Sequence, residues 1–361
     1  MRKVLLIIGG VLVAIIVLLA IAYVWLTWPT PTVRLATWAG TYGRAQSFAL
    51  MAPFKDKTGI DVRIAHYEGG ISDLKRQVDS KTYDWDVVDL ELPDAVKACE
   101  QGLLEKLDTA SLPNPPDFVK GALGPCWVGS MVYSHVIAYS MQHIHSYPPE
   151  MLRDVFDVTR YPGPRALKKN SAKFNVEMAL LASGVAPSDI YKTLSTNAGV
   201  EKALAKLDTI KPQIHWLEPG DQASALLAQG QVTFAMLLNG EIFEAAQEQI
   251  KLSVLWDSQL YQLDVFGIPA GNPQKDRAMD FIRFSTSPES LAHVAEWVPY
   301  GPSRRSALIK VGRNPELNIE MTPWLPTQPD HFRTAFAIDD AWWEKNGARV
   351  DALWQAWLAK P

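Results

Sequence analysis

The sequence predicts an α/β protein that is divided into about two lobes and preceded by an apolar N-terminal helix. Three observations carry this prediction. The chain has 361 residues, of which 48% are hydrophobic, and single hydrophobic cores tend to split beyond roughly 250 to 300 residues. Strand-like and helix-like segments alternate along most of the chain, as they do in parallel sheets covered by helices. An uncharged run over residues 4–28 precedes them.

The composition excludes several classes of protein. A hydrophobic content of this size argues against a disordered chain. The net charge of -4 and the pI near 6.0 argue against a nucleic-acid partner, which usually needs a basic face. Two cysteines are too few for a disulfide scaffold in a chain of this length, but they are sufficient for one bridge. We therefore expect a folded protein that binds no nucleic acid.

Residues 1–28 are expected to direct the chain out of the cytoplasm. Arg2 and Lys3 precede an apolar run that is long enough to cross ~30 Å of hydrocarbon, whereas a signal-peptide core has about 7 to 15 residues. Because basic flanks stay cytoplasmic, the rest of the chain is exported. We expect residues 1–28 to remain as a transmembrane anchor. The alternative is a signal peptide cleaved after Ala22, since Ala20-Ile-Ala22 has the small-x-small form.

The exported part begins with strands that alternate with helices. Alternating or continuous apolar residues predict strands over residues 33–36, 61–67 and 86–90. Apolar residues at helical spacing predict helices over residues 44–58 and 71–80. Ligands of such sheets bind at the carboxyl ends of the strands. We therefore expect a ligand-binding site at the carboxyl ends of these strands.

The middle of the chain repeats this arrangement and indicates a second α/β lobe. Further strands are expected over residues 132–140, 213–216, 232–236 and 263–268. Further helices are expected over residues 175–183, 200–210, 222–229, 275–284 and 289–297. A tail helix over residues 341–360 carries tryptophans at helical spacing. We interpret this stripe as core packing, because an aromatic stripe is more often core than a site.

The sequence lacks the common catalytic motifs. Gly129-Ser130 lacks the second glycine of a nucleophile elbow, and neither a glycine-rich phosphate loop nor a His-Glu-x-x-His motif is present. His143 and His145 are spaced to face the same way on a strand, but further metal ligands are missing, so we interpret them as a solvated loop. We therefore expect no catalytic residue, no metal and no cofactor.

Cys99 and Cys126 are expected to form a disulfide. Export places both thiols in an oxidising compartment, where cysteine pairs persist as bridges. The alternative is a pair of free buried thiols.

Aromatic and acidic residues gather where the expected strands end. Trp38 and Tyr42 follow the first strand, Tyr67 follows the second, and Asp89 and Glu91 end the third. For any single one of them, a packed aromatic ring or a surface carboxylate is at least as good an explanation. Their clustering at strand ends favours a ligand-binding crevice. Candidates of the same residue types elsewhere are Trp127, Trp216, Asn239, Asp264 and Tyr300.

The order of several motifs resembles a known family, the extracellular solute-binding proteins of ABC transporters, and within it the spermidine/putrescine-binding group. The resemblance covers nearly everything after residue 32. Its pieces are Thr37-Trp-Ala-Gly-Thr-Tyr42, Phe54-x-x-x-Thr-Gly-Ile-x-Val62, Trp85-Asp-Val-Val-Asp-Leu-Glu91, Gly121-Ala-Leu-Gly-Pro-Cys-Trp-Val-Gly-Ser130, Gly230-x-Val232, Asn239-Gly240, Leu263-Asp264-x-x-x-Ile-Pro269, Asn272-Pro273 and Tyr300-Gly-Pro-Ser303. The spacing of the two cysteines also resembles a branch of that group.

The resemblance implies a bilobal type II periplasmic-binding-protein fold, with hinge crossings and the ligand clamped between the lobes. Lobe 1 is expected from residues 29–130 and 261–361, the latter with the C-terminal helices, and lobe 2 from residues 131–260. The family's ligand carboxylate falls on Asp264, whereas Glu177 is placed in lobe 2 by pattern alone. The predicted ligand-binding residues are Trp38, Thr41, Tyr42, Tyr67, Glu91, Trp127, Glu177, Trp216, Asn239, Asp264 and Tyr300.

Some positions depart from the family pattern. The family has tryptophans where this chain has Leu238 and Gln262. An acidic pair ahead of the second-lobe helix is replaced by Ser171 and Phe174. Three polyamine contacts are therefore missing, which affects the identity of the ligand more than the transport role.

The expected function is capture of a small cationic, polyamine-like solute and its delivery to an ABC permease. The protein is expected to be a monomer, not an enzyme, on the periplasmic side of the inner membrane, or free in the periplasm if it is cleaved. Alternatives are another solute, such as an amino-acid derivative or a sugar phosphate, an extracytoplasmic hydrolase centred on Ser130 or the His143/His145 pair, or a structural anchor protein without a cleft.

Overall fold

The computed structural model describes residue 17 and residues 30–144, 147–218 and 221–360. Apart from Val17, the expected N-terminal anchor lies outside these residues. Within the part of the chain that is described, no helix has the length and apolar content needed to span a membrane.

One ten-stranded sheet runs through both lobes, in the order β2-β1-β3-β8-β4-β7-β5-β6, with β10 beside β8 and β9 beside β4. The strands are β1 (Thr32–Thr37), β2 (Asp61–His66), β3 (Val87–Glu91), β4 (Val128–Tyr139), β5 (Arg165–Lys168), β6 (Ile214–Leu217), β7 (Phe234–Leu238), β8 (Ser253–Gly267), β9 (Gly301–Pro302) and β10 (Phe336–Ala337). In one lobe β1 pairs in parallel with β2 and β3, and in the other β5 pairs in parallel with β6 and β7. The two halves therefore repeat one arrangement.

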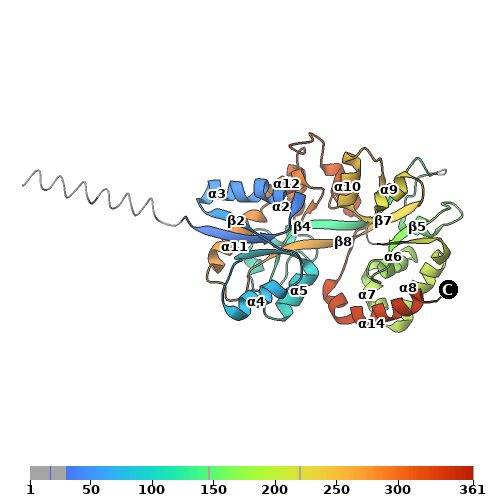
Figure 1. The fold of residues 1–361 in the computed structure, drawn as a ribbon, viewed down its shortest axis with the longest axis horizontal. Coiled ribbons are helices and arrows are strands. Elements are labelled where there is room, and N and C mark those ends of the chain that lie inside the picture. Colours follow the sequence, from blue (N-terminus) through green and yellow to red (C-terminus); the bar gives the residue numbers. More distant parts are fainter. Residues whose placement is uncertain (1–16, 18–29, 145–146, 219–220, 361) are drawn as a thin grey trace, which may run out of the picture.

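The long strands β4 and β8 connect the two lobes (Figure 1). The start of β4, with Val128 and Val132, belongs to the hydrophobic core of lobe 1, whereas Ile137 and Tyr139 near its end belong to a core of lobe 2. The antiparallel strand β8 passes between the same cores in the opposite direction. Each strand is thus a crossing between lobes, which supports the bilobal fold that was expected.

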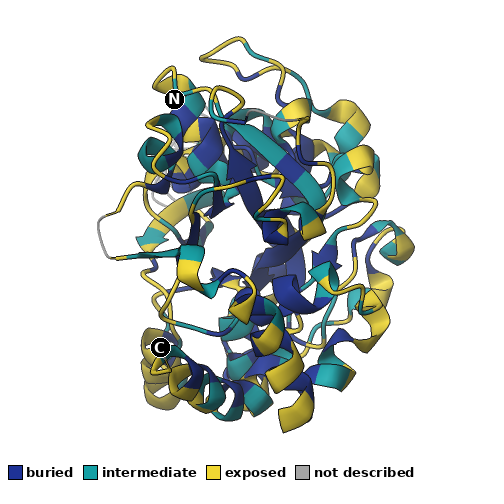
Figure 2. Cartoon of the chain, turned by 90° about the vertical axis from the view of Figure 1, so that its right-hand side faces the viewer, coloured by how far each residue is buried: buried dark blue, intermediate teal, exposed yellow. Residues whose placement is uncertain are grey.

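Helices cover the sheet of lobe 1. Figure 2, in which lobe 2 faces the viewer, shows that buried residues of the chain lie mainly on strands and on inner helix faces. The helices of lobe 1 are α2 (Gly40–Gln46), α3 (Ala52–Thr58), α4 (Ser72–Ser80), α5 (Leu92–Glu100), α11 (Lys275–Ser285) and α12 (Pro288–Trp297), with a π-helical turn at Ser47–Met51 between α2 and α3. Local signals set their ends. Ser287 caps α12 by accepting the Ser290 N–H, and Gly59 ends α3 at a φ of 72°.

Lobe 2 is built in the same way. Its helices are α6 (Asn175–Ala182), α7 (Ile190–Leu194), α8 (Asn197–Asp208), α9 (Ala223–Ala228), α10 (Asn239–Gln247) and the C-terminal α14 (Asp340–Leu358). The short elements of the two lobes are α13 (Pro329–Phe332) and the 3₁₀ turns Thr109–Ser111, Pro115–Asp117, Leu152–Phe156, Pro187–Asp189, Lys211–Gln213, Arg305–Lys310 and Thr322–Trp324. Trp343, Trp354 and Trp357 of α14 are buried in the lobe 2 core. The interpretation of the tryptophan stripe as packing is confirmed.

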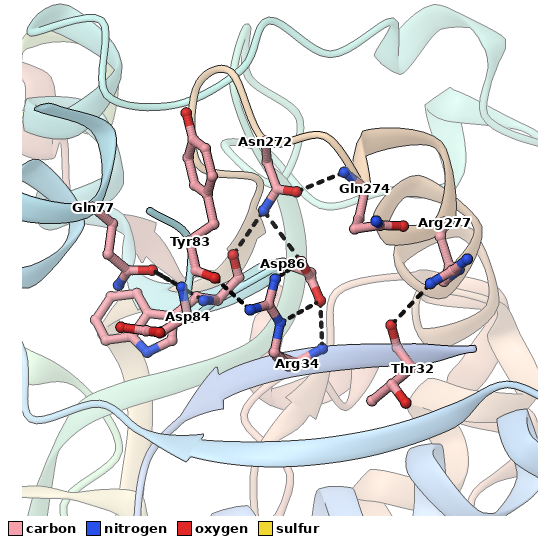
Figure 3. A network of polar contacts seen from close by, with 10 residues as sticks. Thr32, Arg34, Gln77, Tyr83, Asp84, Asp86, Asn272, Gln274 and Arg277 are labelled. Atoms are coloured by element: carbon pink, nitrogen blue, oxygen red, sulfur yellow. Dashed lines mark hydrogen bonds and ion pairs between the residues drawn. The ribbon is translucent and has the colours of Figure 1, made fainter. Parts of the chain in front are cut away.

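A polar network fixes the amino ends of the strands in lobe 1 (Figure 3). Arg34 of β1 forms an ion pair with buried Asp86, with 2.6 Å between Nη2 and Oδ1. Asn272 donates its side-chain N–H to the carbonyl of Trp85 at 2.7 Å. The network holds the start of β3, so the opposite end of β3 is presented at a fixed position.

Most expected elements are present, and the exceptions have physical causes. The strand expected over residues 263–268 is the end of β8, which begins ten residues earlier at Ser253. Ser258 has a positive φ of 57° and interrupts the alternation of apolar residues, so this part of β8 carries no clear strand pattern. Strands β5, β9 and β10 and helices α5, α7, α10 and α13 were not expected.

The disulfide between Cys99 and Cys126 is formed, as predicted from export. It joins the end of α5 to the segment before β4. The divisions expected at residues 131 and 261 fall within β4 and β8, and we retain them as a proposed division. After residue 261 the chain itself divides, because α11 belongs to the core of lobe 1 whereas α14 packs in lobe 2.

Candidate functional site

Three carboxylates gather where β3 and β8 pair. The antiparallel register places Glu91, the last residue of β3, opposite Asp264 of β8. Asp89 lies two residues before Glu91, and alternate residues of a strand point to the same face. The next pair along the sheet is Gln262 of β8 and Tyr133 of β4. A polar row therefore crosses the centre of the sheet, where the strands pass between lobes.

Asp89 is fully buried and held by neutral donors. It accepts hydrogen bonds from the Gln46 amide and, at 3.3 Å, from Ser130 Oγ. Tyr42 Oη lies 3.3 Å from the same Ser130 Oγ. Burial raises the pKa of Asp89 to about 7, although these hydrogen bonds act in the opposite direction. Helix α2, through Gln46, and strand β4, through Ser130, thus supply the side chains that hold this carboxyl in place.

Asp264 is buried and has no positive partner among the described residues. Its exposed fraction is 5%, and none of the ion pairs in the described part of the chain involves Asp89, Glu91 or Asp264. Burial, followed by the charges of Asp89 and Glu91, raises the pKa of Asp264 well above its usual range. A buried charge without a partner is costly. The cluster is therefore electrostatically incomplete.

Aromatic rings surround the carboxylates. The ring centroids of Tyr42 and Tyr300 lie 5.5 Å apart, and those of Tyr133 and Tyr300 lie 6.2 Å apart. Trp38 and Tyr67 form an edge-to-face pair with centroids 4.8 Å apart. Burial and the nearby acids Glu91 and Asp264 raise the pKa of Tyr133, so its phenol stays neutral. Such rings attract cations through their faces.

A cavity of about 160 Å³ opens between the two lobes. Thr41 and Tyr42 of α2 line it from lobe 1, and Gly240 and Glu244 of α10 line it from lobe 2. Tyr300 is a further lining residue, and its pKa is raised by burial and by Asp264, whose charge acts on it. The cavity thus lies between the lobes and is bordered by Tyr42 and Tyr300, two of the rings around the carboxylates, whereas Asp89, Glu91 and Asp264 do not line it.

A second charged group lies at the other end of the row. Lys173 of lobe 2 forms an ion pair with Asp340, the first residue of α14, with 2.6 Å between Nζ and Oδ1. Gln262 donates its amide N–H to the same oxygen at 2.9 Å. Burial raises the pKa of Asp340, whereas Lys173 acts to lower it. The other oxygen, Oδ2, is buried without a hydrogen-bond partner among the described residues.

The segment that carries Lys173 has a defined shape. Phe174 has a positive φ of 72°, which is rare for a bulky residue. Its ring stacks on His135 at a centroid distance of 3.7 Å, and its N–H donates to Glu177 Oε2 at 2.8 Å. Burial, followed by Lys168 and Lys173, lowers the pKa of His135 to about 3. His135 is therefore a neutral platform for Phe174.

The structure places Thr41, Tyr42 and Tyr300 on the cavity and sets Glu91 opposite Asp264. Tyr67, whose pKa Glu91 helps to raise, packs against Trp38. The structure places other predicted residues elsewhere. Glu177 is 0% exposed and accepts the Trp343 Nε1–H at 2.6 Å inside lobe 2. Trp216 packs edge-to-face on Trp354, and Trp127 donates its indole N–H to the Gly121 carbonyl at 3.1 Å. These side chains are held in packing or structural hydrogen bonds.

Asn239 clamps the crossing segments instead of lining the cavity. Its Oδ1 accepts the Ser134 N–H at 3.0 Å, and its amide donates to the Pro299 carbonyl at 2.5 Å. It therefore ties α10 and β4 to the segment that leads to β9.

Sequence reasoning missed Tyr133, Lys173 and Asp340. Tyr133 lies inside a buried strand, and its side-chain direction depends on the register with Gln262. Lys173 and Asp340 are 167 residues apart in the chain, so no local pattern joins them. The one available signal was the basic character of residues 168–173.

The described residues hold no group of three or more His, Cys, Asp or Glu side chains that is arranged for a metal ion. His143 lies with Nε2 3.0 Å from the Ala228 carbonyl, and His145 lies outside the described residues.

Comparison with known proteins gives three kinds of match. The family model described as bacterial extracellular solute-binding protein matches residues 49–318. The gamma-aminobutyric acid-binding protein of Pseudomonas aeruginosa is 34% identical over 329 residues, 91% of each chain. The spermidine/putrescine-binding periplasmic protein of Escherichia coli is 24% identical over 323 residues, 86% of this chain and 87% of the relative. A solved GABA receptor has a TM-score of 0.73 and 30% identity, covering 91% of this chain and 98% of its own.

Proposed function

The chain belongs to the bacterial extracellular solute-binding proteins, the periplasmic substrate-binding components of ABC transporters, and we propose that its solute carries a primary ammonium group. One observation carries the proposal. Asp264 is buried beside Asp89 and Glu91 without a positive partner in the described part of the chain. An ammonium group would supply the missing positive charge and donate hydrogen bonds to these oxygens, and charge-assisted hydrogen bonds are the strong ones.

The aromatic rings complete this recognition. Tyr42, Tyr133 and Tyr300 surround the carboxylates, and each face that contacts a cation contributes roughly 0.5 to 2 kcal/mol. The rings also exclude water, which strengthens the attraction between the ammonium group and the carboxylates. The apolar chain of the solute would lie against them.

Closure of the lobes is the proposed mechanism of capture. Strands β4 and β8 join the lobes, and the cavity is lined by α2 from one lobe and α10 from the other. A solute that contacts both lobes binds the closed form better than the open form. This difference in affinity shifts the population towards the closed form, which is the form presented to the permease.

The proposal leaves two ligand classes to be compared. The relatives are named for gamma-aminobutyric acid and for spermidine and putrescine, and all of these solutes carry a primary ammonium group. The polyamine expected from the sequence stays a prediction. A sugar phosphate suits the site poorly, because the phosphate would be repelled by Asp89, Glu91 and Asp264.

The hydrolase alternative lacks its base. The side-chain partners of Ser130 Oγ in the described structure are Asp89 and Tyr42, whereas a serine nucleophile needs a base such as histidine within about 3 Å.

A calorimetric titration of the purified exported chain tests the proposal. The ligands are gamma-aminobutyric acid, putrescine and spermidine. The control ligands are butyrate, which lacks the ammonium group of gamma-aminobutyric acid, and N-acetylputrescine, which lacks one ammonium group of putrescine. We expect binding by at least one of the three amines and no binding of butyrate. Binding of butyrate as tight as that of gamma-aminobutyric acid would contradict a site built for an ammonium group, and so would the failure of all three amines to bind.

A further inference from the structure

The lobe 2 segment 168–174 differs in charge from the strand ends of lobe 1. The strand ends of lobe 1 contribute Asp89, Glu91 and Asp264, whereas the charged residues of the lobe 2 segment 168–174 are all lysines. Lys173 acts on the opposite lobe, because its charge opposes the rise in the pKa of Glu91 that burial causes. A positive group of lobe 2 therefore acts on Glu91 of the anionic row.

The position of Lys173 is fixed relative to Asp264 through β8. Lys173 pairs with Asp340, and Asp340 accepts a hydrogen bond from Gln262. Gln262 lies two residues before Asp264 on the same strand, a step of about 6.8 Å. The row thus has an anionic end at Asp264 and a cationic end at Lys173. Along β8 the two ends are separated by at least the two-residue step from Asp264 to Gln262.

Lys173 is the member of the ion pair that a ligand meets first. The side chain of Lys173 is 18% exposed, whereas that of Asp340 is 0% exposed. Asp340 therefore lies behind the lysine, where it orients Nζ and receives the Gln262 amide. Nζ has three N–H donors, so it can bind a second acceptor while it stays paired.

The segment around Lys173 is held in one conformation. Phe174 is fixed by its stacking on His135 and by its N–H bond to Glu177. The Ala172 N–H donates to Asp351 Oδ1 of α14 at 2.9 Å. The lysine ammonium also lies 5.4 Å from the Phe174 ring centroid. A backbone held in a rare conformation is a feature of binding sites, and it lowers the ordering cost of binding.

We propose that Lys173 binds a carboxylate of the ligand, and that the solute is therefore an ω-amino acid with its ammonium group at Asp264. This proposal rests on the proposed function above. A diamine of similar length would place its second ammonium group beside Lys173, where like charges repel. An ω-amino acid places an anion there, and a few methylene groups bridge the step along β8.

Calorimetric titration of charge variants with gamma-aminobutyric acid and putrescine tests the proposal. Lys173→Met keeps the apolar stem over Phe174 and removes the charge, and Lys173→Arg keeps the charge. Lys202→Met, an exposed lysine on α8 of the same lobe, is the matched control. We expect Lys173→Met to lose at least tenfold in affinity for gamma-aminobutyric acid while its affinity for putrescine is unchanged or higher. Lys173→Arg should lose less, and Lys202→Met should match the wild type.

Three outcomes would overturn the proposal. The first is that the wild type binds putrescine but not gamma-aminobutyric acid. The second is that Lys173→Met keeps its affinity for gamma-aminobutyric acid. The third is that Lys173→Met, shown by circular dichroism to be folded, loses affinity for both ligands equally. In the first two cases the ammonium site stands, so the proposed function survives. Failure of the proposed function is recognised separately, because the wild type would then bind none of gamma-aminobutyric acid, putrescine and spermidine.

Discussion

Replacement of Asp264 by asparagine is predicted to lower ligand affinity and raise the stability of the unliganded protein. Asparagine keeps the shape of the side chain and removes its charge. Because burial raises the pKa of Asp264, the ionised carboxyl is less favourable in the folded than in the unfolded chain. The wild type therefore loses stability as the pH rises from the unfolded value through the raised folded pKa. The variant has no such group, so its advantage is greatest at alkaline pH and disappears in acid.

The size of the binding effect follows from the burial of Asp264. Removing one partner of a desolvated charge pair costs roughly 2 to 5 kcal/mol, which is a loss of affinity of about thirtyfold to several thousandfold. The neighbouring carboxyl sets a scale for stability. The rise in the pKa of Asp89 from 3.8 to about 7 lowers the free energy of unfolding by about 4 kcal/mol at pH values above the raised pKa. The effect at Asp264 has the same sign.

Calorimetric titration and thermal melting measure both quantities. Wild type, Asp264→Asn and a control, Asp79→Asn, are melted without ligand at pH 5 and pH 8 and titrated with gamma-aminobutyric acid and putrescine. Asp79 is exposed on α4 and pairs with Lys75, so its replacement should change neither property by much. Unchanged affinity in Asp264→Asn would refute the role in binding. A melting temperature of Asp264→Asn below that of the wild type at pH 8 would refute the argument that the buried charge of Asp264 destabilises the unliganded protein.

Three further predictions concern other parts of the fold. Replacing Cys99 and Cys126 by alanine should lower the free energy of unfolding by about 3 to 4 kcal/mol in urea titrations, because the bridge closes a loop with a sequence separation of 27; an unchanged midpoint would contradict this. Trp343→Phe removes a donor to buried Glu177 and should cost about 1 to 3 kcal/mol at pH 8, but less at pH 5, since the pKa of Glu177 is raised to about 7; equal losses at both pH values would oppose this explanation. Tyr300→Ala should weaken amine binding by roughly 1 to 2 kcal/mol in titration calorimetry, and unchanged affinity would exclude the ring from the site.

The sequence was sufficient for the elements whose signals are local. The apolar runs of β1 and β3 and the helical spacing in α4 and α11 predicted those elements within a few residues. The strand end at Glu91 was likewise visible in the sequence. These features depend on neighbours in the chain, which a single sequence displays directly.

Features that depend on long-range register were not predictable from the pattern of residues. The pairing of Glu91 with Asp264 joins segments far apart in the chain, and only the family resemblance placed both in one pocket. Glu177 is the reverse case, a residue predicted to bind the ligand whose side chain the structure holds inside lobe 2. An acidic residue in the first turn of a helix accepts N–H bonds at that helix start, and Glu177 does so with Phe174. That local role was not separated from a ligand-binding role at the sequence level.

The position of the charged residues on β8 connects binding with movement of the lobes. Asp264 and Gln262 lie on a strand that passes from one core to the other. Gln262 contacts Asp340, the start of a helix whose tryptophans are packed in the core of lobe 2. Asp264 pairs with β3, whose residues are packed in the core of lobe 1. A solute held at both positions therefore contacts groups fixed to different lobes, and its ends are separated along the strand that joins them. Such a solute stabilises the one lobe arrangement that satisfies both ends at once, so the length of the solute and the closed state select each other.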